Sequence, residues 1–186
     1  MIFTECKLSG AFIIDLETIE DARGFFARTW CQREFREHGL NTSTAQVNIG
    51  FSRRKGTLRG MHYQEPPRDE VKVVRCTRGA VYDVIIDLRP DSRTYTQWAG
   101  VELTAGNHRI LYVPQGFAHG YQALEDNTEI CYQTSEFYHP EAARGVRYSD
   151  PKFGIEWPLE TTVISEADRS WPDYRSSQAA TAGALL

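Results

Sequence analysis

The chain has 186 residues, of which 41% are hydrophobic, 12% aromatic and 25% charged, a length that suits one domain with a substantial core. Its 21 Lys and Arg against 25 Asp and Glu give a formal net charge of -4, which disfavours a nucleic-acid polymer as partner. No apolar run approaches the roughly 20 residues of a membrane span, and the first residues lack the pattern of a secretion signal, so we expect a cytoplasmic protein without a membrane partner.

Short apolar and aromatic runs separated by turn residues dominate the chain. The first two lie at 12–16 and 25–30, with a turn at 21–24 between them, and a short helix is expected at 32–40. The strands expected after it are 45–51, 57–64, 71–77, 80–88, 96–103, 109–113, 120–124 and 129–135. Because no helical segments separate these strands, the pattern predicts an all-β sandwich or barrel and excludes a βαβ fold.

From about residue 148 onward the sequence predicts loops, with a short helix starting near Ser165. The final stretch, 176–186, is small and polar and has too little to bury, so we expect it to be disordered. The sequence therefore predicts a single domain over 1–175 followed by a disordered tail.

Two expected strands carry polar side chains that alternation places together. Leu58, His62 and Gln64 lie on one face of their strand. Lys72 lies on one face of the next strand, together with Val74 and Cys76. If the two strands form a hairpin with these faces inward, His62 and Lys72 meet inside one barrel. Otherwise both are ordinary rim or surface residues.

Arg59 differs in parity from His62, so a regular strand aims the two side chains to opposite faces. Only a β-bulge near Gly60 would bring both into one pocket.

A second segment joins a strand to a Pro-x-Gly turn at 114–116 and then to His119. Together the two segments resemble the paired motifs of cupins, whose metal-binding members supply His-x-His and a downstream Glu. Here His62 is followed by Gln64, and Lys72 stands near the Glu position. A protonated lysine has no lone pair and repels a divalent cation, so we expect no bound metal. The four cysteines have neither metal-ligand nor disulfide spacing.

Several motifs occur in order along the chain: Asp-x-Arg-Gly-x-Phe at 21–26, Gln-x-Asn at 46–48, Leu-Arg-Gly-Met-His-Tyr-Gln at 58–64, Gly-x-Val-x-Asp-Val at 79–84, Asp-Leu-Arg at 87–89, Pro-x-Gly-Phe-Ala-His-Gly at 114–120, Tyr132, Tyr138 and Asp-Pro at 150–151. Through these motifs the chain resembles, over about residues 2–172, the dTDP-4-dehydrorhamnose 3,5-epimerase family, a metal-free branch of the cupins. The resemblance implies a cupin-type β-barrel (jelly roll) with a few short helices. It also implies a cofactor-independent epimerase that converts dTDP-4-dehydro-6-deoxyglucose to dTDP-4-dehydrorhamnose. A homodimer that exchanges N-terminal strands and shares its active sites is implied as well.

The resemblance assigns four catalytic roles. His62 is the base that removes the proton beside the ketone, and Asp168 orients its imidazole. Lys72 stabilises the negative charge of the enolate oxygen, and Tyr132 returns a proton on the opposite face.

A second set of residues is implied to bind the nucleotide sugar. Arg59 and His119 contact the diphosphate, with Arg23 contributed by a neighbouring chain, because guanidinium groups match phosphate geometry. The residues implied at the nucleoside and sugar are Phe26, Gln46, Asn48 and Tyr138, the last as an aromatic that stacks on the base. Read without the resemblance, Arg23 fits a turn, Asn48 a strand end and Tyr138 a core. We expect structural roles for Asp83 and Asp87.

Five residues depart from the family pattern: Arg28, Ile49, Gly50, Ala143 and Tyr148. We expect them to cluster on the nucleotide side of the site and to shift the nucleotide or sugar preference. The alternatives are an epimerase of one carbon (3 or 5) or a ketoisomerase acting on a dTDP, CDP or GDP sugar. A sugar-nucleotide-binding cupin without catalysis is a competing class, and a metal-dependent dioxygenase or isomerase comes third.

Overall fold

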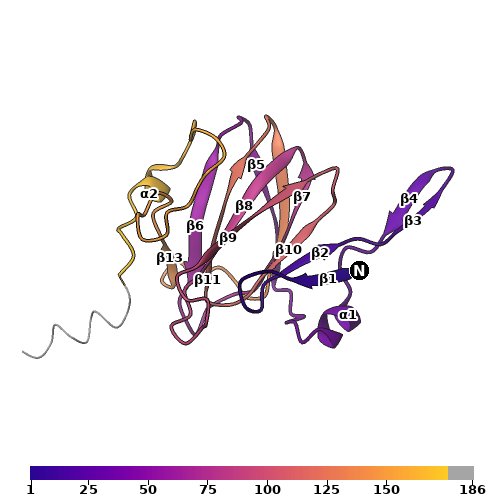
Figure 1. Ribbon diagram of the computed structural model, residues 1–186, viewed down its shortest axis with the longest axis horizontal. Coiled ribbons are helices and arrows are strands. Elements are labelled where there is room, and N and C mark those ends of the chain that lie inside the picture. Colours follow the sequence, from indigo (N-terminus) through magenta and orange to yellow (C-terminus); the bar gives the residue numbers. More distant parts are fainter. Residues whose placement is uncertain (176–186) are drawn as a thin grey trace, which may run out of the picture.

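The computed structural model describes residues 1–175, in which two antiparallel sheets face each other across a hydrophobic interior (Figure 1). The six-stranded sheet has the order β1-β2-β10-β7-β12-β5, the five-stranded sheet β13-β6-β11-β8-β9, and β3-β4 form a separate hairpin. The strands are β1 (Ile2–Glu5), β2 (Phe12–Asp15), β3 (Thr18–Asp21), β4 (Gly24–Ala27), β5 (Gln46–Ser52), β6 (Leu58–Gln64), β7 (Lys72–Arg78), β8 (Ala80–Asp87), β9 (Trp98–Thr104), β10 (Ile110–Val113), β11 (Phe117–Ala123), β12 (Thr128–Thr134) and β13 (Ala143–Gly145). The helices are α1 (Gln32–Glu37) and α2 (Glu166–Arg169).

From β6 to β12 the chain repeatedly crosses between the two sheets, as a jelly roll requires. The predicted all-β, cupin-type barrel is thereby confirmed. Its largest core cluster lies between the sheets and includes Val74, Ile85, Leu111 and Ile130. The disordered tail expected at 176–186 lies outside the described residues. Within residues 1–175, no helix is long and apolar enough to span a bilayer.

Strand boundaries differ from the predicted ones where pairing is decided by distant partners. Strands β1, β3 and β13 were not predicted, since each has only three or four residues and depends on its partner for hydrogen bonds. β11 begins at Phe117 rather than at 120, because it pairs with β8 along its whole length. Helix α1 ends at Glu37 rather than 40, since Gly39 adopts a φ of +71° just beyond it.

Strands β6 and β7 do not form the hairpin considered from the sequence. β6 pairs with β11 and β13, whereas β7 pairs with β10 and β12 in the other sheet. The inward faces of β6 and β7 nevertheless lie opposite each other across the barrel. His62 and Lys72 therefore meet in the interior because their two sheets face each other, although strands β6 and β7 are not hydrogen-bonded to each other.

The β-bulge near Gly60 is present. His119 of β11 pairs with His62, but Tyr121 pairs with Arg59, so β6 contains one residue more than β11 over this interval. Arg59 and His62 consequently point to the same side, and Leu58, opposite Gln122, is turned to the other face. The expected alignment of Leu58 with His62 was therefore wrong.

Glycine at position 60 is required by close backbone contact. Gly60 has a φ of +129°, and a Cβ placed on it would lie 2.5 Å from Cα of Gly120. A Cβ on Gly120 would in turn meet the carbonyl oxygen of Arg59 at 2.7 Å. The bulge thus depends on two glycines that touch across β6 and β11.

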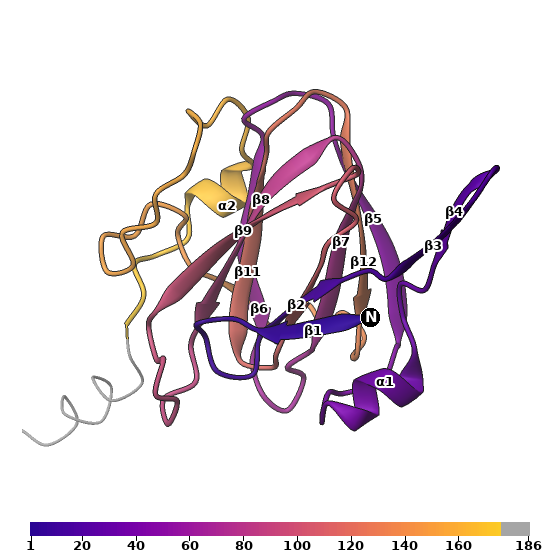
Figure 2. The same ribbon diagram turned by 45° about the vertical axis from the view of Figure 1, so that its right-hand side comes forward.

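The hairpin β3-β4 projects away from the barrel as an arm, clearest in Figure 2. Its apolar side chains are exposed: Ile19 at 69%, Phe25 at 49% and Phe26 at 65%. Exposure of three large apolar groups on one hairpin is typical of a contact surface.

We predict that Gly60→Ala lowers the free energy of unfolding by about 2–6 kcal/mol, because it combines backbone strain with overpacking against Gly120. Gly24→Ala is the matched control, since Gly24 has a similar φ of +126° and nothing within 4 Å of its added Cβ. That variant is expected to lose at most about 1–3 kcal/mol. Urea unfolding monitored by circular dichroism measures both, and equal losses would contradict the role assigned to the Gly60–Gly120 contact.

Candidate active site

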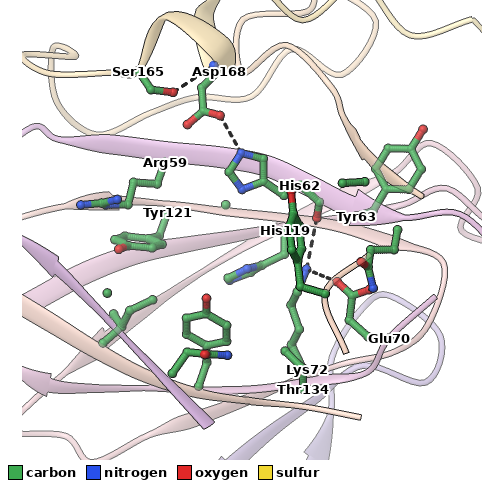
Figure 3. Close-up of a pocket in the computed structure, with 18 of the residues that line it drawn as sticks. Arg59, His62, Tyr63, Glu70, Lys72, His119, Tyr121, Thr134, Ser165 and Asp168 are labelled. Atoms are coloured by element: carbon green, nitrogen blue, oxygen red, sulfur yellow. Dashed lines mark hydrogen bonds and ion pairs between the residues drawn. The ribbon is translucent and has the colours of Figure 1, made fainter. Parts of the chain in front are cut away.

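A cavity of about 900 Å³ opens between the two sheets, a size suited to a small ligand (Figure 3). Nine of the eleven predicted site residues line it: Gln46, Asn48, Arg59, His62, Lys72, His119, Tyr132, Tyr138 and Asp168. They come from both sheets and from α2, so residues far apart in sequence meet in one place.

His62 and Asp168 form a hydrogen-bonded pair at the mouth of the cavity. His62 Nε2 lies 2.6 Å from Oδ1 of Asp168, and the backbone N–H of Gly60 donates to Oδ2 at 3.3 Å. Ser165 caps α2 by accepting a hydrogen bond from the Asp168 N–H, which fixes the carboxylate at the start of the helix. Because an ionised carboxylate only accepts hydrogen bonds, Nε2 carries the proton and Nδ1 keeps its lone pair.

The surroundings of Asp168 keep it ionised. Burial alone would raise its pKa, but the hydrogen bonds from His62 and from the N–H of Gly60 outweigh burial and lower the pKa below its usual value. With half of its side chain exposed, His62 faces the open cavity while Asp168 is buried behind it.

Lys72 lies deeper in the barrel, on the opposite wall. Its Nζ is 2.8 Å from Oε1 of Glu70 and donates to the carbonyl oxygen of His62 at 3.3 Å. Glu70 also accepts a hydrogen bond of 2.8 Å from Gln64. An ammonium group has three N–H donors, so one more remains for an acceptor in the cavity.

Tyr132 lies near Lys72 on the six-stranded sheet. Thr134 of β12 is the register partner of Lys72, and Tyr132 lies two residues before Thr134 on the same inward face. Burial raises the pKa of its phenol above the ordinary value, while the charge of Arg59 partly opposes this. The phenol is therefore protonated at neutral pH and can donate a proton.

Arg59 and His119 provide further hydrogen-bonding groups on the five-stranded sheet, where His119 is the register partner of His62 and Arg59 that of Tyr121. The guanidinium of Arg59 donates to the carbonyl oxygen of Phe51 at 2.8 Å. His119 Nε2 lies 2.8 Å and 3.0 Å from the two carboxylate oxygens of Asp83, which is fully buried. Nε2 thus carries a proton, and Asp83 acts by holding His119, a contact beyond the purely structural role expected for it.

Strand β5 and the rim supply the remaining polar groups. Gln46 and Asn48 point inward from β5, and Gln46 Oε1 accepts a hydrogen bond of 2.9 Å from the N–H of Tyr138. Tyr138 is 66% exposed at the edge of the cavity, so it is not a core aromatic. Within residues 1–175, no three His, Cys, Asp or Glu side chains are grouped to hold a metal ion.

Arg23 and Phe26 lie outside the cavity of this chain, on the arm. The Arg23 side chain is 89% exposed and pairs with Asp21. Since the family resemblance places Arg23 in a neighbouring chain's site, one chain alone is not expected to contain it.

Several lining residues were not found from the sequence, among them Glu70, Tyr121 and Trp171. Glu70 and Trp171 lie in loops, where alternation gives no signal. Tyr121 shares the parity of His119 along β11, and this pattern could have identified it.

The five departures from the family pattern do not cluster around the cavity of the chain. Gly50 and Ala143 line it, whereas Ile49 points outward, 67% exposed. Arg28 pairs with Glu34 on α1, and Tyr148 is not a lining residue. Alternation along β5 separates neighbours such as Ile49 and Gly50, and clustering of the five on the nucleotide side stays a prediction.

The jelly-roll barrel and its cavity define a cupin-type protein whose site is equipped for acid–base chemistry on a ligand with negative charge. The sequence model described as dTDP-4-dehydrorhamnose 3,5-epimerase matches residues 5–176. The dTDP-4-dehydrorhamnose 3,5-epimerase of Methanothermobacter thermautotrophicus is 43% identical over 178 residues, covering 94% of this chain and 95% of its own. The chain therefore belongs to the dTDP-4-dehydrorhamnose 3,5-epimerase family.

Two further similarities bear on its reaction. The crystal structure of the Bacillus anthracis 3,5-epimerase with TDP and PPi bound has a TM-score of 0.90 at 36% identity, covering 93% of this chain and 99% of that one. The dTDP-4-dehydrorhamnose 3-epimerase of Streptomyces niveus is 37% identical, covering 87% of this chain and 78% of its own. The relatives of this chain therefore include both a 3,5-epimerase and a 3-epimerase.

We predict that Asp168→Asn lowers the free energy of unfolding at pH 7 by about 1–3 kcal/mol, since it removes a buried, hydrogen-bonded charge. The folded-state pKa of Asp168 is lowered, so its contribution is present above the unfolded value of 3.8 and disappears as the pH falls through the folded pKa. The difference between wild type and variant should shrink below about pH 4 in denaturant titrations. Asp91→Asn, an exposed change, is the control; a difference undiminished at low pH would contradict the prediction.

Proposed function

We propose that the protein epimerises dTDP-4-dehydro-6-deoxyglucose at carbons 3 and 5 to give dTDP-4-dehydrorhamnose. The convergence of His62, Lys72 and Tyr132 on one cavity is the observation that carries this proposal. Epimerisation beside a ketone needs a base, a group that stabilises the enolate oxygen, and an acid, and these three side chains supply the three functions.

His62 acts as the base through Nδ1, the nitrogen that is not bonded to Asp168. A neutral imidazole suits this role because its free nitrogen can accept a proton and release it again in each cycle. As Nδ1 takes the proton, the ionised carboxylate of Asp168 stabilises the imidazolium that forms. The ketone at carbon 4 acidifies both carbon 3 and carbon 5, so one base can serve both positions.

Lys72 stabilises the negative charge that moves onto the ketone oxygen. Its ammonium group is already held by Glu70 and the carbonyl oxygen of His62, so little reorganisation is needed when the charge develops. The protonated phenol of Tyr132 then delivers a proton to the face of the sugar opposite His62. The imidazolium of His62 then releases its proton to water and the phenolate of Tyr132 takes one up from water, which resets both groups.

Arg59 and His119 bind the diphosphate. Because the Nε2–H of His119 is bonded to Asp83, His119 donates to a phosphate oxygen through a proton on Nδ1. Gln46 and Asn48 contact the nucleoside or sugar, and Tyr138 at the rim stacks on the base. A phosphate oxygen accepts several hydrogen bonds at once, which matches the number of donors at this end of the cavity.

We predict that the wild-type protein, given dTDP-4-dehydro-6-deoxyglucose in deuterated water, introduces deuterium at both carbons 3 and 5. His62→Asn should slow exchange about 10²–10⁴-fold, and Lys72→Met about 10²–10³-fold. Mass spectrometry and NMR measure the label.

His38→Asn is the matched control, since His38 lies on the surface at the end of α1 and should leave exchange unchanged. Label at only one carbon would favour an epimerase of the Streptomyces niveus type. Binding of the nucleotide sugar without any exchange would favour a binding module and refute the enzymatic proposal.

We further propose a homodimer in which the arm of each protomer lies on the other. β5 is an edge strand of the six-stranded sheet, and its outward side chains Val47, Ile49 and Phe51 are exposed at 60%, 67% and 39%. An exposed apolar edge strand and an exposed apolar arm are both unfavourable alone, and contact between two copies would cover both. In this arrangement Arg23 and Phe26 reach the cavity of the partner.

Mixed dimers test this arrangement. Arg23→Ala and His62→Asn homodimers should each be nearly inactive, because every site lacks one group. When the two variants are co-expressed, a mixed dimer regains one complete site, so random pairing should restore about a quarter of the wild-type sites. Activity assays of the purified mixture measure this, and no recovery despite demonstrated mixed dimers would contradict shared sites.

A further inference from the structure

Tyr121 carries a buried hydroxyl that the mechanism above does not use. Its side chain projects from β11 into the cavity and is only 5% exposed. Among residues 1–175, its oxygen makes no hydrogen bond of normal geometry, and the hydroxyl of Ser52 is the neighbouring polar side chain. Buried polar groups are nearly always hydrogen-bonded, because an unpaired one destabilises the folded protein. A hydroxyl kept unpaired in a ligand cavity indicates a partner that arrives with the ligand.

The position of this hydroxyl indicates the part of the ligand it meets. Tyr121 is the register partner of Arg59 and lies two residues after His119 on the same face of β11, and Figure 3 shows Tyr121 directly beside Arg59. Arg59 and His62 are separated by roughly 7–10 Å along β6. The hydroxyl therefore lies at the Arg59 end of the cavity, whereas His119 is the register partner of His62.

Gly50 makes the space for the hydroxyl. A Cβ on Gly50 would lie 2.8 Å from the Tyr121 oxygen, so any side chain at position 50 would displace it. Position 50 is also one of the places where this sequence departs from the family pattern. The Tyr121 hydroxyl from β11 therefore occupies the space that a side chain at position 50 of β5 would fill.

We propose that the Tyr121 hydroxyl donates a hydrogen bond to the diphosphate of the nucleotide sugar, beside Arg59. This inference rests on the proposed function, because it assumes a nucleoside diphosphate in the cavity. Phosphate oxygens only accept hydrogen bonds, and Tyr121 provides a neutral donor that adds no charge to the site. Tyr121 is a binding residue in this account and takes no part in proton transfer.

Tyr121→Phe tests the inference, with dTDP and thymidine as probes in isothermal titration calorimetry. The variant should bind dTDP about tenfold to a hundredfold more weakly, the usual loss for a hydrogen bond to a charged acceptor, and should bind thymidine as wild type does. KM for the sugar nucleotide should rise with kcat nearly unchanged. The ligand-free variant should melt at the wild-type temperature or above it, because the hydroxyl removed had no partner.

Two further variants separate this role from a structural one. Gly50→Ala displaces the hydroxyl and should weaken dTDP binding similarly, and the double variant Gly50→Ala/Tyr121→Phe should be no weaker than the more affected single one. Tyr82→Phe, a half-buried tyrosine outside the cavity, is the matched control and should bind dTDP normally.

Three results would overturn the inference. If Tyr121→Phe binds dTDP as tightly as wild type, the hydroxyl does not contact the diphosphate. If it loses dTDP and thymidine affinity equally, or melts at a lower temperature, its role is structural. If wild-type protein does not bind dTDP at all, the proposed function fails and the inference falls with it, an outcome distinct from the first two.

Discussion

The site depends on the close contact between Gly60 of β6 and Gly120 of β11. This contact permits the extra residue in β6, and the extra residue turns Arg59 to the same side as His62. Without it, strand alternation would send the arginine out of the barrel and leave the cavity with a base but without its main cation. The N–H of Gly60 also donates to Asp168, so the same distortion that aligns the side chains helps to hold the carboxylate behind His62.

A second principle is that the two histidines and the lysine of the cavity are each backed by a carboxylate, whereas Arg59 is held by the carbonyl oxygen of Phe51. Asp168 holds His62, Glu70 holds Lys72, and Asp83 holds His119. Burying an unpaired charge is costly, and pairing lets the protein keep these groups inside a barrel. The pairing also reconciles a net charge of -4 with an anionic ligand, because recognition depends on a few oriented donors and not on the total charge.

Strand β5 connects the cavity with the proposed dimer contact. Its inward residues Gln46, Asn48 and Gly50 line the cavity, and its outward residues Val47 and Ile49 are exposed. A change of register in this one strand would therefore alter both surfaces together. Substrate binding and association of two copies are expected to be physically coupled through it, particularly if the partner's arm brings Arg23 to the cavity.

The all-β class, the family and most of the predicted catalytic and binding residues followed from the sequence alone, because short strands separated by turn residues and ordered motifs are local signals. The sequence also indicated that Arg59 and His62 could meet only through a bulge near Gly60. The tertiary structure decided that β6 and β7 face each other without pairing, that Glu70 joins Lys72, and that Asp83 supports His119. It alone placed the Tyr121 hydroxyl over Gly50. These contacts join residues on different strands or loops, and which strands become neighbours depends on the packing of two whole sheets, which no local pattern records.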